Sequence, residues 1–419
     1  MKVNIYKILF IVLLLTLIST KVELSFAFAI VSLIISAKDK VIRPVGVVLF
    51  LFLIIFSIGF FGFLRSDYSV GVYIKDLVYF SRPILVILAS YFLIKKISDK
   101  SFLFTVVILL GFAYSITHIS MILMNLNKIS NVTEVRTQGG RYNHLELIAY
   151  IFILTSNTGK VKLYLTKFTY NVFVVLLSIS FILYFSRVMF VVLVLFILAY
   201  KGYFRLTKKG LRLIFFGTIL LTSFMMIVNK FDVDSNSDGI EGFIFKIQNT
   251  YSEMFESLDI EKIKRDKRDL WKHWRGYEAQ SAIETLNDKG YFSWAFGRGF
   301  GSTVDLGVEV RLANEDVRYI PILHNGFIYV LFKTGIVGLL VYMMYIIYLY
   351  SLYRLNSNSS IEFNINRLIV GCAFYIALSS LVVTGVFKPY DLSGIVLGAL
   401  FALKNHYNEN RHIRNERSA

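Results

Sequence analysis

Long apolar runs separated by short basic turns constrain the fold of this chain more than any other feature of its sequence. Runs of about 15–25 apolar residues are long enough to cross a hydrocarbon core of about 30 Å as helices. Inside lipid each backbone N–H and C=O must be paired within the protein, so we expect these runs to be helical. Twelve such runs lie at about 5–20, 22–37, 45–64, 77–94, 102–124, 143–158, 168–185, 187–200, 212–229, 323–350, 367–386 and 390–403. The pattern predicts an all-α polytopic membrane protein with about 12 transmembrane helices.

The composition supports one membrane bundle over several soluble domains. Of the 419 residues, 56% are hydrophobic and 17% are charged, whereas about 25% of the residues of a soluble domain are charged. The single cysteine, Cys372, lies in an apolar run, which excludes a disulfide framework and a cysteine metal site. The histidines and carboxylates also lack the spacing of a ligand set, so the sequence predicts no metal.

The distribution of charge gives an orientation. Residues 230–321 contain 13 Lys/Arg and 17 Asp/Glu, which leaves 32 basic and 11 acidic residues for the rest of the chain. The basic residues cluster in the short turns that fall on one side of the bundle, as the positive-inside rule expects of the cytoplasmic side. This pattern argues against a nucleic-acid partner, although the net charge is +17. It places both termini in the cytoplasm.

Three regions follow from this reading. Residues 1–229 are predicted to form the first nine transmembrane helices, and the first apolar run lacks a small-residue cleavage site, so we expect it to be retained. Residues 230–322 form one large loop on the outer side. Residues 323–419 form the last three helices and a basic cytoplasmic tail. The loop has helix-like spacing from Glu253 to Lys289, so we expect a folded, mostly helical cap.

Arginines are the most unusual residues on the predicted outer side. The guanidinium group is permanently charged and matches the geometry of phosphate oxygens. Arg187 is the strongest candidate for binding phosphate, because Ser186-Arg187 lies in the short turn between two apolar runs. The alternative is an arginine that reaches toward lipid headgroups. Near Arg298, the glycine-rich turn Gly297–Gly301 either presents backbone N–H groups to an anion or is a plain turn.

A histidine stands where the loop returns to the membrane. His324 precedes Asn325 and Gly326 at the start of the run 323–350. A neutral imidazole at this boundary can accept a proton from a hydroxyl group. The alternative is a histidine that caps the helix or lies at the interface.

Three further polar residues lie within the apolar runs. Lys333 either pairs with a carboxylate or an anionic lipid group, or extends toward the interface. Glu146 is placed to orient His144 or an arginine. His118 is predicted to be a satisfied residue of the bundle.

Three short stretches together resemble the O-antigen ligase and O-antigen polymerase family of bacterial membrane glycan transferases. The first is Phe185-Ser186-Arg187. The second is Trp274-Arg275-Gly276-Tyr277 followed by Phe296-Gly297-Arg298-Gly299-Phe300-Gly301. The third is His324-Asn325-Gly326-Phe327 with Lys333-Thr334-Gly335-Ile336-Val337-Gly338. The motifs cover residues 140–350, and their order and common outer placement carry the resemblance.

The resemblance implies a GT-C-like bundle in the bacterial inner membrane. Its implied activity is an inverting, metal-independent transfer of a glycan from undecaprenyl diphosphate on the periplasmic side, with no cofactor. It implies His324 as the catalytic base, and it assigns binding of the donor diphosphate to four arginines: Arg187, Arg275, Arg141 and Arg298. Asn325, Lys333 and Glu146 are supporting candidates.

The acceptor separates the activities within this family. A polymerase uses an undecaprenyl-diphosphate-linked glycan as donor and as acceptor, and its expected protein partner is a chain-length regulator. A ligase transfers the glycan to lipid A core. The sequence motifs do not separate the two, and we favour the polymerase. Twelve spans also suit a flippase for the same lipid-linked unit, but the chain shows no internal repeat, whereas transporters commonly do.

Overall fold

The computed structural model describes residues 4–19, 21–64, 68–128, 143–156, 165–204, 273–312, 315–354 and 360–418, with isolated residues between 135 and 270. Arg141, most of the predicted run 212–229 and most of the loop before 273 lie outside the described residues. The chain divides into two compact units. The first comprises 1–97, 253–351 and 372–419, and the second comprises 98–252 and 352–371.

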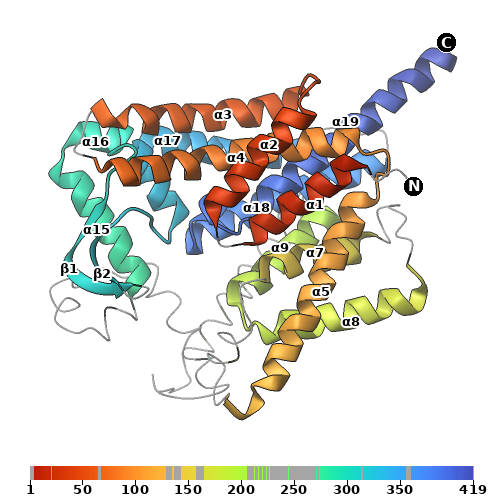
Figure 1. Cartoon of the computed structure of the whole chain (residues 1–419), viewed down its shortest axis with the longest axis horizontal. Coiled ribbons are helices and arrows are strands. Elements are labelled where there is room, and N and C mark those ends of the chain that lie inside the picture. Colours follow the sequence, from red (N-terminus) through yellow and green to blue (C-terminus); the bar gives the residue numbers. More distant parts are fainter. Residues whose placement is uncertain are drawn as a thin grey trace. The chain divides into compact units, whose positions relative to one another are not determined.

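The first unit contains most of the described elements (Figure 1). Its helices and strands are α1 (Ile5–Ile18), α2 (Val22–Ser36), α3 (Arg43–Phe60), the 3-10 helix η1 (Phe61–Leu64), α4 (Val70–Lys96), α15 (Trp274–Asp288), α16 (Tyr291–Phe296), β1 (Val304–Leu312), β2 (Glu315–Ile320), α17 (Gly326–Ser351), η4 (Gly385–Phe387) and α19 (Ser393–Ser418). At its centre α4 packs against α1, α2, α3 and α19. The stretch of α4 from Pro83 to Ile94 is apolar on nearly all sides and mostly buried, as expected of a helix in the interior of a bundle.

The second unit contains the short 3-10 helices η2 (Leu126–Lys128) and η3 (Leu352–Arg354) and four longer helices, α5 (Phe102–Met124), α7 (Asn143–Ser156), α8 (Lys167–Leu183) and α9 (Arg187–Lys201). Helix α5 packs against α7 and α8, and α7 packs against α8 and α9. Helix α18 (Ser360–Val382) begins in this unit and ends in the first.

The mostly helical membrane fold is confirmed. Within the described part of the chain, five helices are long and apolar enough to cross a membrane, namely Arg43–Leu64, Val70–Lys96, Phe102–Met124, Gly326–Ser351 and Asn364–Val382. Shorter apolar helices occupy Ile5–Ile18, Val22–Ser36 and Lys167–Leu183. Twelve crossings and the outer position of the loop stay predictions.

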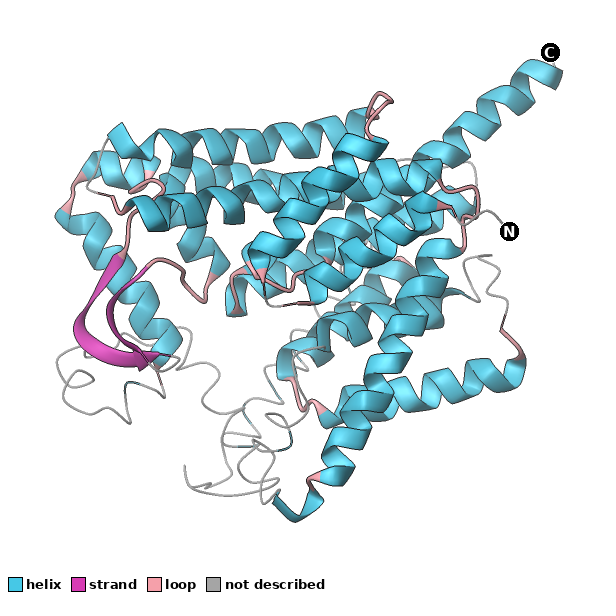
Figure 2. Cartoon of the chain, in the orientation of Figure 1, coloured by secondary structure: helices cyan, strands magenta, loops and turns pink. Residues whose placement is uncertain are grey.

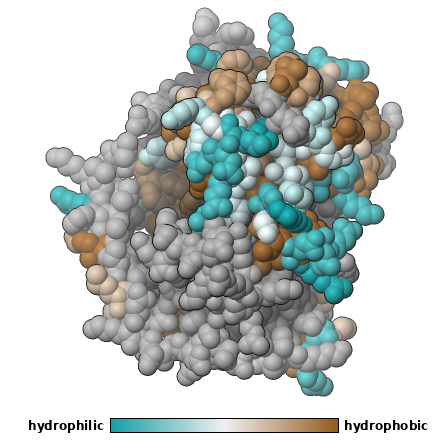
Figure 3. Space-filling model, turned by 90° about the vertical axis from the view of Figure 1, so that its left-hand side faces the viewer, coloured by the Kyte–Doolittle hydropathy of each residue, from teal (hydrophilic) through white to brown (hydrophobic). Residues whose placement is uncertain are grey.

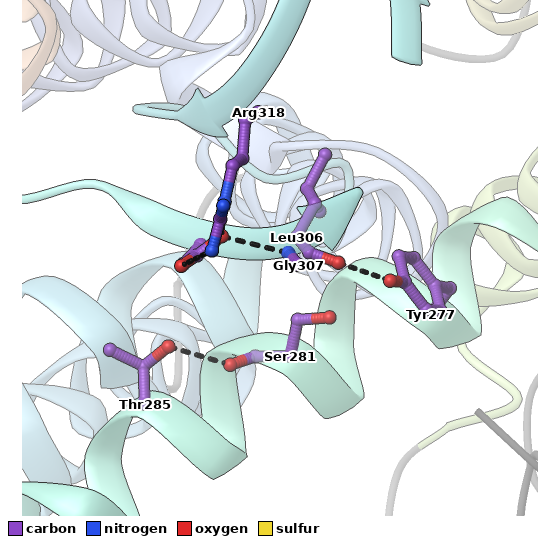
Figure 4. Close-up of polar contacts among 7 residues, drawn as sticks. Tyr277, Ser281, Thr285, Leu306, Gly307 and Arg318 are labelled. Atoms are coloured by element: carbon purple, nitrogen blue, oxygen red, sulfur yellow. Dashed lines mark hydrogen bonds and ion pairs between the residues drawn. The ribbon is translucent and has the colours of Figure 1, made fainter. Parts of the chain in front are cut away.

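A β-hairpin interrupts the expected all-α architecture, and Figure 2 shows it as the magenta pair of strands. Strands β1 and β2 are antiparallel, and the register shifts between Asp305 and Val310. The sequence of β1 alternates apolar and polar residues, which is the period of a strand with one buried face. The Tyr277 hydroxyl on α15 donates a hydrogen bond to the Leu306 carbonyl, which ties the hairpin to the helix (Figure 4).

The predicted run 323–350 is not one continuous helix. Gly335 has φ 67° and ψ −170°, which divides α17 into a first segment, 326–334, and a second segment, 336–351. A Cβ atom at Gly335 would lie 2.3 Å from the carbonyl oxygen of Ala295 on α16. Only glycine fits both this backbone conformation and this close approach. The break lets α16 pack directly against α17.

Candidate functional site

His324 and Glu278 form a hydrogen-bonded pair at the start of α17. The Nδ1 atom of His324 lies 2.9 Å from both carboxylate oxygens of Glu278, and the backbone N–H of His324 donates to Oε2 at 3.0 Å. The Glu278 side chain is 3% exposed, whereas the His324 side chain is 51% exposed. A buried carboxylate on α15 therefore holds an imidazole whose other side faces outward.

The pairing determines which ring nitrogen of His324 can act as a base. An ionised carboxylate only accepts hydrogen bonds, so Nδ1 must carry the proton that Glu278 binds. The lone pair of the neutral ring is then on Nε2. This is the arrangement in which a carboxylate orients a histidine for general-base catalysis and neutralises the positive charge that develops when the ring takes a proton.

The local sequence fixes the position of His324. The Oδ1 atom of Asn325 accepts hydrogen bonds from the N–H groups of Phe327 and Ile328, at 3.0 and 3.1 Å, and so caps α17. The hydroxyl of Thr384 donates to the Leu323 carbonyl at 3.0 Å. Asn325 thus performs the capping that was the alternative role for His324, and this leaves the imidazole available for chemistry.

Arg275 lies on α15, three residues before Glu278. Residues at i and i+3 are neighbours on one face of a helix, so Arg275 shares the face that carries Glu278. It is exposed, while Trp274 and Tyr277 are buried and anchor the helix. Figure 3 faces the end of the molecule that carries α15, α16 and the hairpin, and hydrophilic residues gather on it. A cationic side chain on this end is placed to meet an anionic ligand.

The glycine-rich turn is packed into the protein and does not present its N–H groups to solvent. The N–H groups of Arg298 and Gly299 donate to the carbonyls of Phe332 and Lys333, at 2.7 and 2.9 Å, and the N–H of Phe300 donates to the Gly59 carbonyl at 2.9 Å. The N–H of Gly301 donates to Oδ2 of Asp76 at 2.9 Å. These donors are occupied, so the reading of an anion-binding turn is wrong for residues 298–301. The partly exposed Arg298 side chain remains the candidate ligand.

Lys333 pairs with a carboxylate, which was one of its three predicted roles. Its Nζ atom lies 2.5 Å from Oδ2 of Asp76 and 2.6 Å from the Ser302 carbonyl oxygen. Both side chains of the ion pair are fully buried. The Tyr329 hydroxyl donates to Oδ1 of Asp76 at 3.1 Å. Lys333 is therefore a buried structural partner that lies beneath the turn carrying Arg298.

Arg187 and Glu146 belong to the second unit. Arg187 is the first residue of α9, and Phe185, two residues earlier, has the positive φ of 44°. Among described residues other than glycine, Phe185 alone has this backbone conformation. Such strain persists where the surrounding structure holds it and is concentrated at functional sites.

Glu146 accepts hydrogen bonds from the hydroxyls of Ser180 and Tyr184, the latter at 2.8 Å. His118 Nδ1 lies 2.7 Å from the same Ser180 hydroxyl, and the His118 ring stacks on Tyr184 with 3.9 Å between centroids. His118 is a buried residue of the bundle, as predicted, and it is hydrogen-bonded through Nδ1, while Nε2 has no hydrogen-bond partner in the described part of the chain. The cluster fixes the end of α8 directly before Phe185-Ser186-Arg187.

Sequence reasoning missed Glu278 and Asp76. Glu278 is one of 17 acidic residues between positions 230 and 321, and its three-residue spacing from Arg275 was the available signal. Asp76 lies inside α4, one residue before the predicted run 77–94. An acidic residue inside a membrane helix is a functional candidate, so a longer predicted run would have identified it.

A comparison with known protein families matches the region of the chain that contains these residues. Residues 172–343 match the model of the O-antigen ligase family. The matched region contains Arg187, Arg275, Glu278, Arg298 and His324. No curated protein matches the sequence. The predicted resemblance to the O-antigen ligase and O-antigen polymerase family is confirmed over residues 172–343.

Proposed function

We propose that this chain belongs to the O-antigen ligase and O-antigen polymerase family and polymerises undecaprenyl-diphosphate-linked oligosaccharide repeat units on the periplasmic face of the bacterial inner membrane. The observation that carries the proposal is the pairing of the half-exposed His324 with the buried Glu278. The pair lies at the start of a candidate membrane span, where a lipid-linked substrate and a water-soluble glycan chain meet. The proposal keeps both termini in the cytoplasm on the basis of the positive-inside rule.

The chemistry follows from the tautomer that Glu278 selects. Nε2 of His324 takes the proton from a hydroxyl of the acceptor sugar as its oxygen attacks the anomeric carbon of the donor. The bond from that carbon to the diphosphate oxygen breaks, and undecaprenyl diphosphate leaves with the bonding electron pair. Attack opposite the leaving group inverts the anomeric centre. The Glu278 carboxylate neutralises the charge on the imidazolium ring until the ring loses its proton.

The departing diphosphate needs fixed positive charge, because negative charge develops on its oxygen as the bond breaks. Arg275 lies on the helix that carries Glu278, and Arg298 lies on the turn that binds α17. We assign both to the diphosphate, and Arg187 and Arg141 stay further candidates on the basis of the sequence resemblance alone. Arginines that supply this charge make the transfer metal-independent.

The ligase reaction uses the same base and the same arginines, and only its acceptor, the lipid A core, differs. The match to the O-antigen ligase family supports transfer chemistry and gives no support to the flippase alternative. The acceptor therefore decides between polymerase and ligase, and the products formed in cells identify it.

The test uses a strain that lacks this chain and carries plasmid-borne variants. We expect His324→Ala to abolish long glycan while the protein still inserts in the membrane, and His406→Ala, on α19, serves as the matched control. A deletion strain whose lipopolysaccharide stops at core plus one repeat unit identifies a polymerase. Bare core with accumulated lipid-linked polymer identifies a ligase. Normal glycan from His324→Ala would refute the assignment of the base.

A further inference from the structure

We propose that the buried ion pair of Asp76 and Lys333 fixes the spacing between Arg298 and His324, and that both residues of the pair are positioning residues for the transfer reaction. This inference rests on the proposed function, because it assigns Arg298 to the donor diphosphate and His324 to the acceptor hydroxyl. It extends that function to two residues that touch neither substrate.

The first segment of α17 connects the two groups. His324 stands two residues before the segment begins at Gly326, and Lys333 is next to its last residue. Nine helical residues span about 13 Å at 1.5 Å per residue. The N–H of Arg298 binds the Phe332 carbonyl, and the N–H of Gly299 binds the Lys333 carbonyl. The backbone of Arg298 is therefore attached to one end of a short rigid element whose other end carries His324.

The ion pair holds the turn on this element. One carboxylate oxygen of Asp76 binds both the Lys333 ammonium group, at 2.5 Å, and the Gly301 N–H, at 2.9 Å. The same ammonium group donates to the Ser302 carbonyl at 2.6 Å. Asp76 thus joins α4, the first segment of α17 and the turn 297–302. Lys333 joins the same three elements through its bonds to Asp76 and to the Ser302 carbonyl.

The glycines of the turn also hold it in close contact with α17. A Cβ atom at Gly297 would lie 2.4 Å from the backbone nitrogen of Thr334, and one at Gly299 would lie 2.2 Å from Cα of Gly62. The turn therefore fits against α17 and η1 without space for a side chain at either position. Interfaces packed this closely move as one body, so the turn stays in register with His324 while the ion pair is intact.

The need for this precision follows from the reaction. The acceptor oxygen must approach the anomeric carbon to about 3–3.5 Å, and a displacement of about 1 Å between groups that bind the two reactants reduces the rate about 100-fold. A buried pair of charges is not needed for stability alone, because an apolar pair of the same size often serves as well. Its use here agrees with a requirement for one fixed arrangement.

The test replaces both charges at once, because removal of one partner would leave an uncompensated buried charge. The double variant Asp76→Asn, Lys333→Met keeps the side-chain volumes similar and carries no charge at either position. We expect the full-length protein in lipid nanodiscs to show a kcat lowered about 100-fold if the groups move by about 1 Å, with smaller changes in the donor and acceptor KM. Tyr329→Phe removes one hydrogen bond to Asp76 and should lower kcat about twofold to fivefold. The exposed neighbour Lys75→Met is the matched control.

A second readout does not depend on activity. Spin labels are attached at Arg298→Cys and Ile322→Cys, and the buried Cys372 is replaced by serine. The labels report the distance between the turn and the segment directly before α17. We expect one narrow distance distribution in the parent and a broadened or shifted distribution in the double variant. An unchanged distribution, or an unchanged kcat in the double variant, would overturn the positioning role. An active His324→Ala enzyme would refute the proposed function and leave the distance result to decide this inference on its own.

Discussion

The replacement Glu278→Gln tests the orientation of His324 directly. Glutamine has nearly the same shape as glutamate, but it has one acceptor oxygen where the carboxylate has two. Glu278 receives hydrogen bonds from both the backbone N–H and the Nδ1–H of His324. The amide can satisfy one of these donors through its oxygen, and its NH2 group would then face the other donor. The variant therefore loses the charge and the preference for the productive tautomer.

The expected loss can be calculated from the geometry. Two unit charges about 4 Å apart at an effective dielectric of about 20 interact by about 4 kcal/mol. The His324 side chain is 51% exposed, so water screens part of this attraction, and about half of it, about 2 kcal/mol, is a reasonable expectation. This corresponds to about a 30-fold decrease in kcat, since 1.36 kcal/mol is a factor of ten. The wrong tautomer lowers kcat further.

The assay is polymer formation by the purified protein in nanodiscs with lipid-linked repeat units. The matched control is Glu284→Gln, because Glu284 is an exposed carboxylate on the same helix. We expect the control to retain the kcat of the parent. A Glu278→Gln enzyme with an unchanged kcat would show that the carboxylate neither orients nor neutralises the base.

The remaining predictions concern the backbone, the second unit and the topology. Gly335→Ala should abolish activity or prevent stable folding, because Gly335 combines a φ of 67° with close contact to α16. Gly46 has open space around it, so the control Gly46→Ala should be neutral. Size-exclusion profiles and glycan ladders of the two variants test this difference. Ser180→Ala should lower the free energy of unfolding by about 1–3 kcal/mol, because it removes one hydroxyl that joins a buried carboxylate and a buried imidazole; thermal unfolding of the purified protein measures this loss. A reporter fused at Ser237 should be periplasmic and one at Lys208 cytoplasmic, and the opposite result would contradict the orientation.

Much of the helical fold could be predicted because hydropathy is a local property of the sequence. The runs at 102–124 and 187–200 correspond within one residue to α5 and α9. His324 and Asn325 stood out for the same reason, since they mark a polar break before an apolar run. The break at Gly335 was not predictable in this way, because one glycine inside an apolar run changes hydropathy little, and its contact with Ala295 depends on tertiary packing.

The partners of the site residues depend on the fold and not on the local sequence. Glu278 lies 46 positions before His324, and Asp76 lies 257 positions before Lys333. Sequence spacing alone offers no means to select these two carboxylates among 28 acidic residues. The hairpin β1–β2 was missed because its alternating pattern lies in a loop whose preceding segment has helical spacing. The partners of the site residues and the pairing of the two strands are contacts between distant parts of the sequence, and tertiary packing decides such contacts.

The pairing of Glu278 with His324 divides the proposed catalytic pair between two separate elements of the chain. The base belongs to the start of α17, and its orienting carboxylate belongs to α15, whose opposite neighbour is the hairpin with the exposed pair Arg318 and Asp305. A change in the hairpin that shifts α15 would therefore alter the orientation of His324 through Glu278, because the Tyr277 hydroxyl ties the hairpin to the helix that carries this carboxylate.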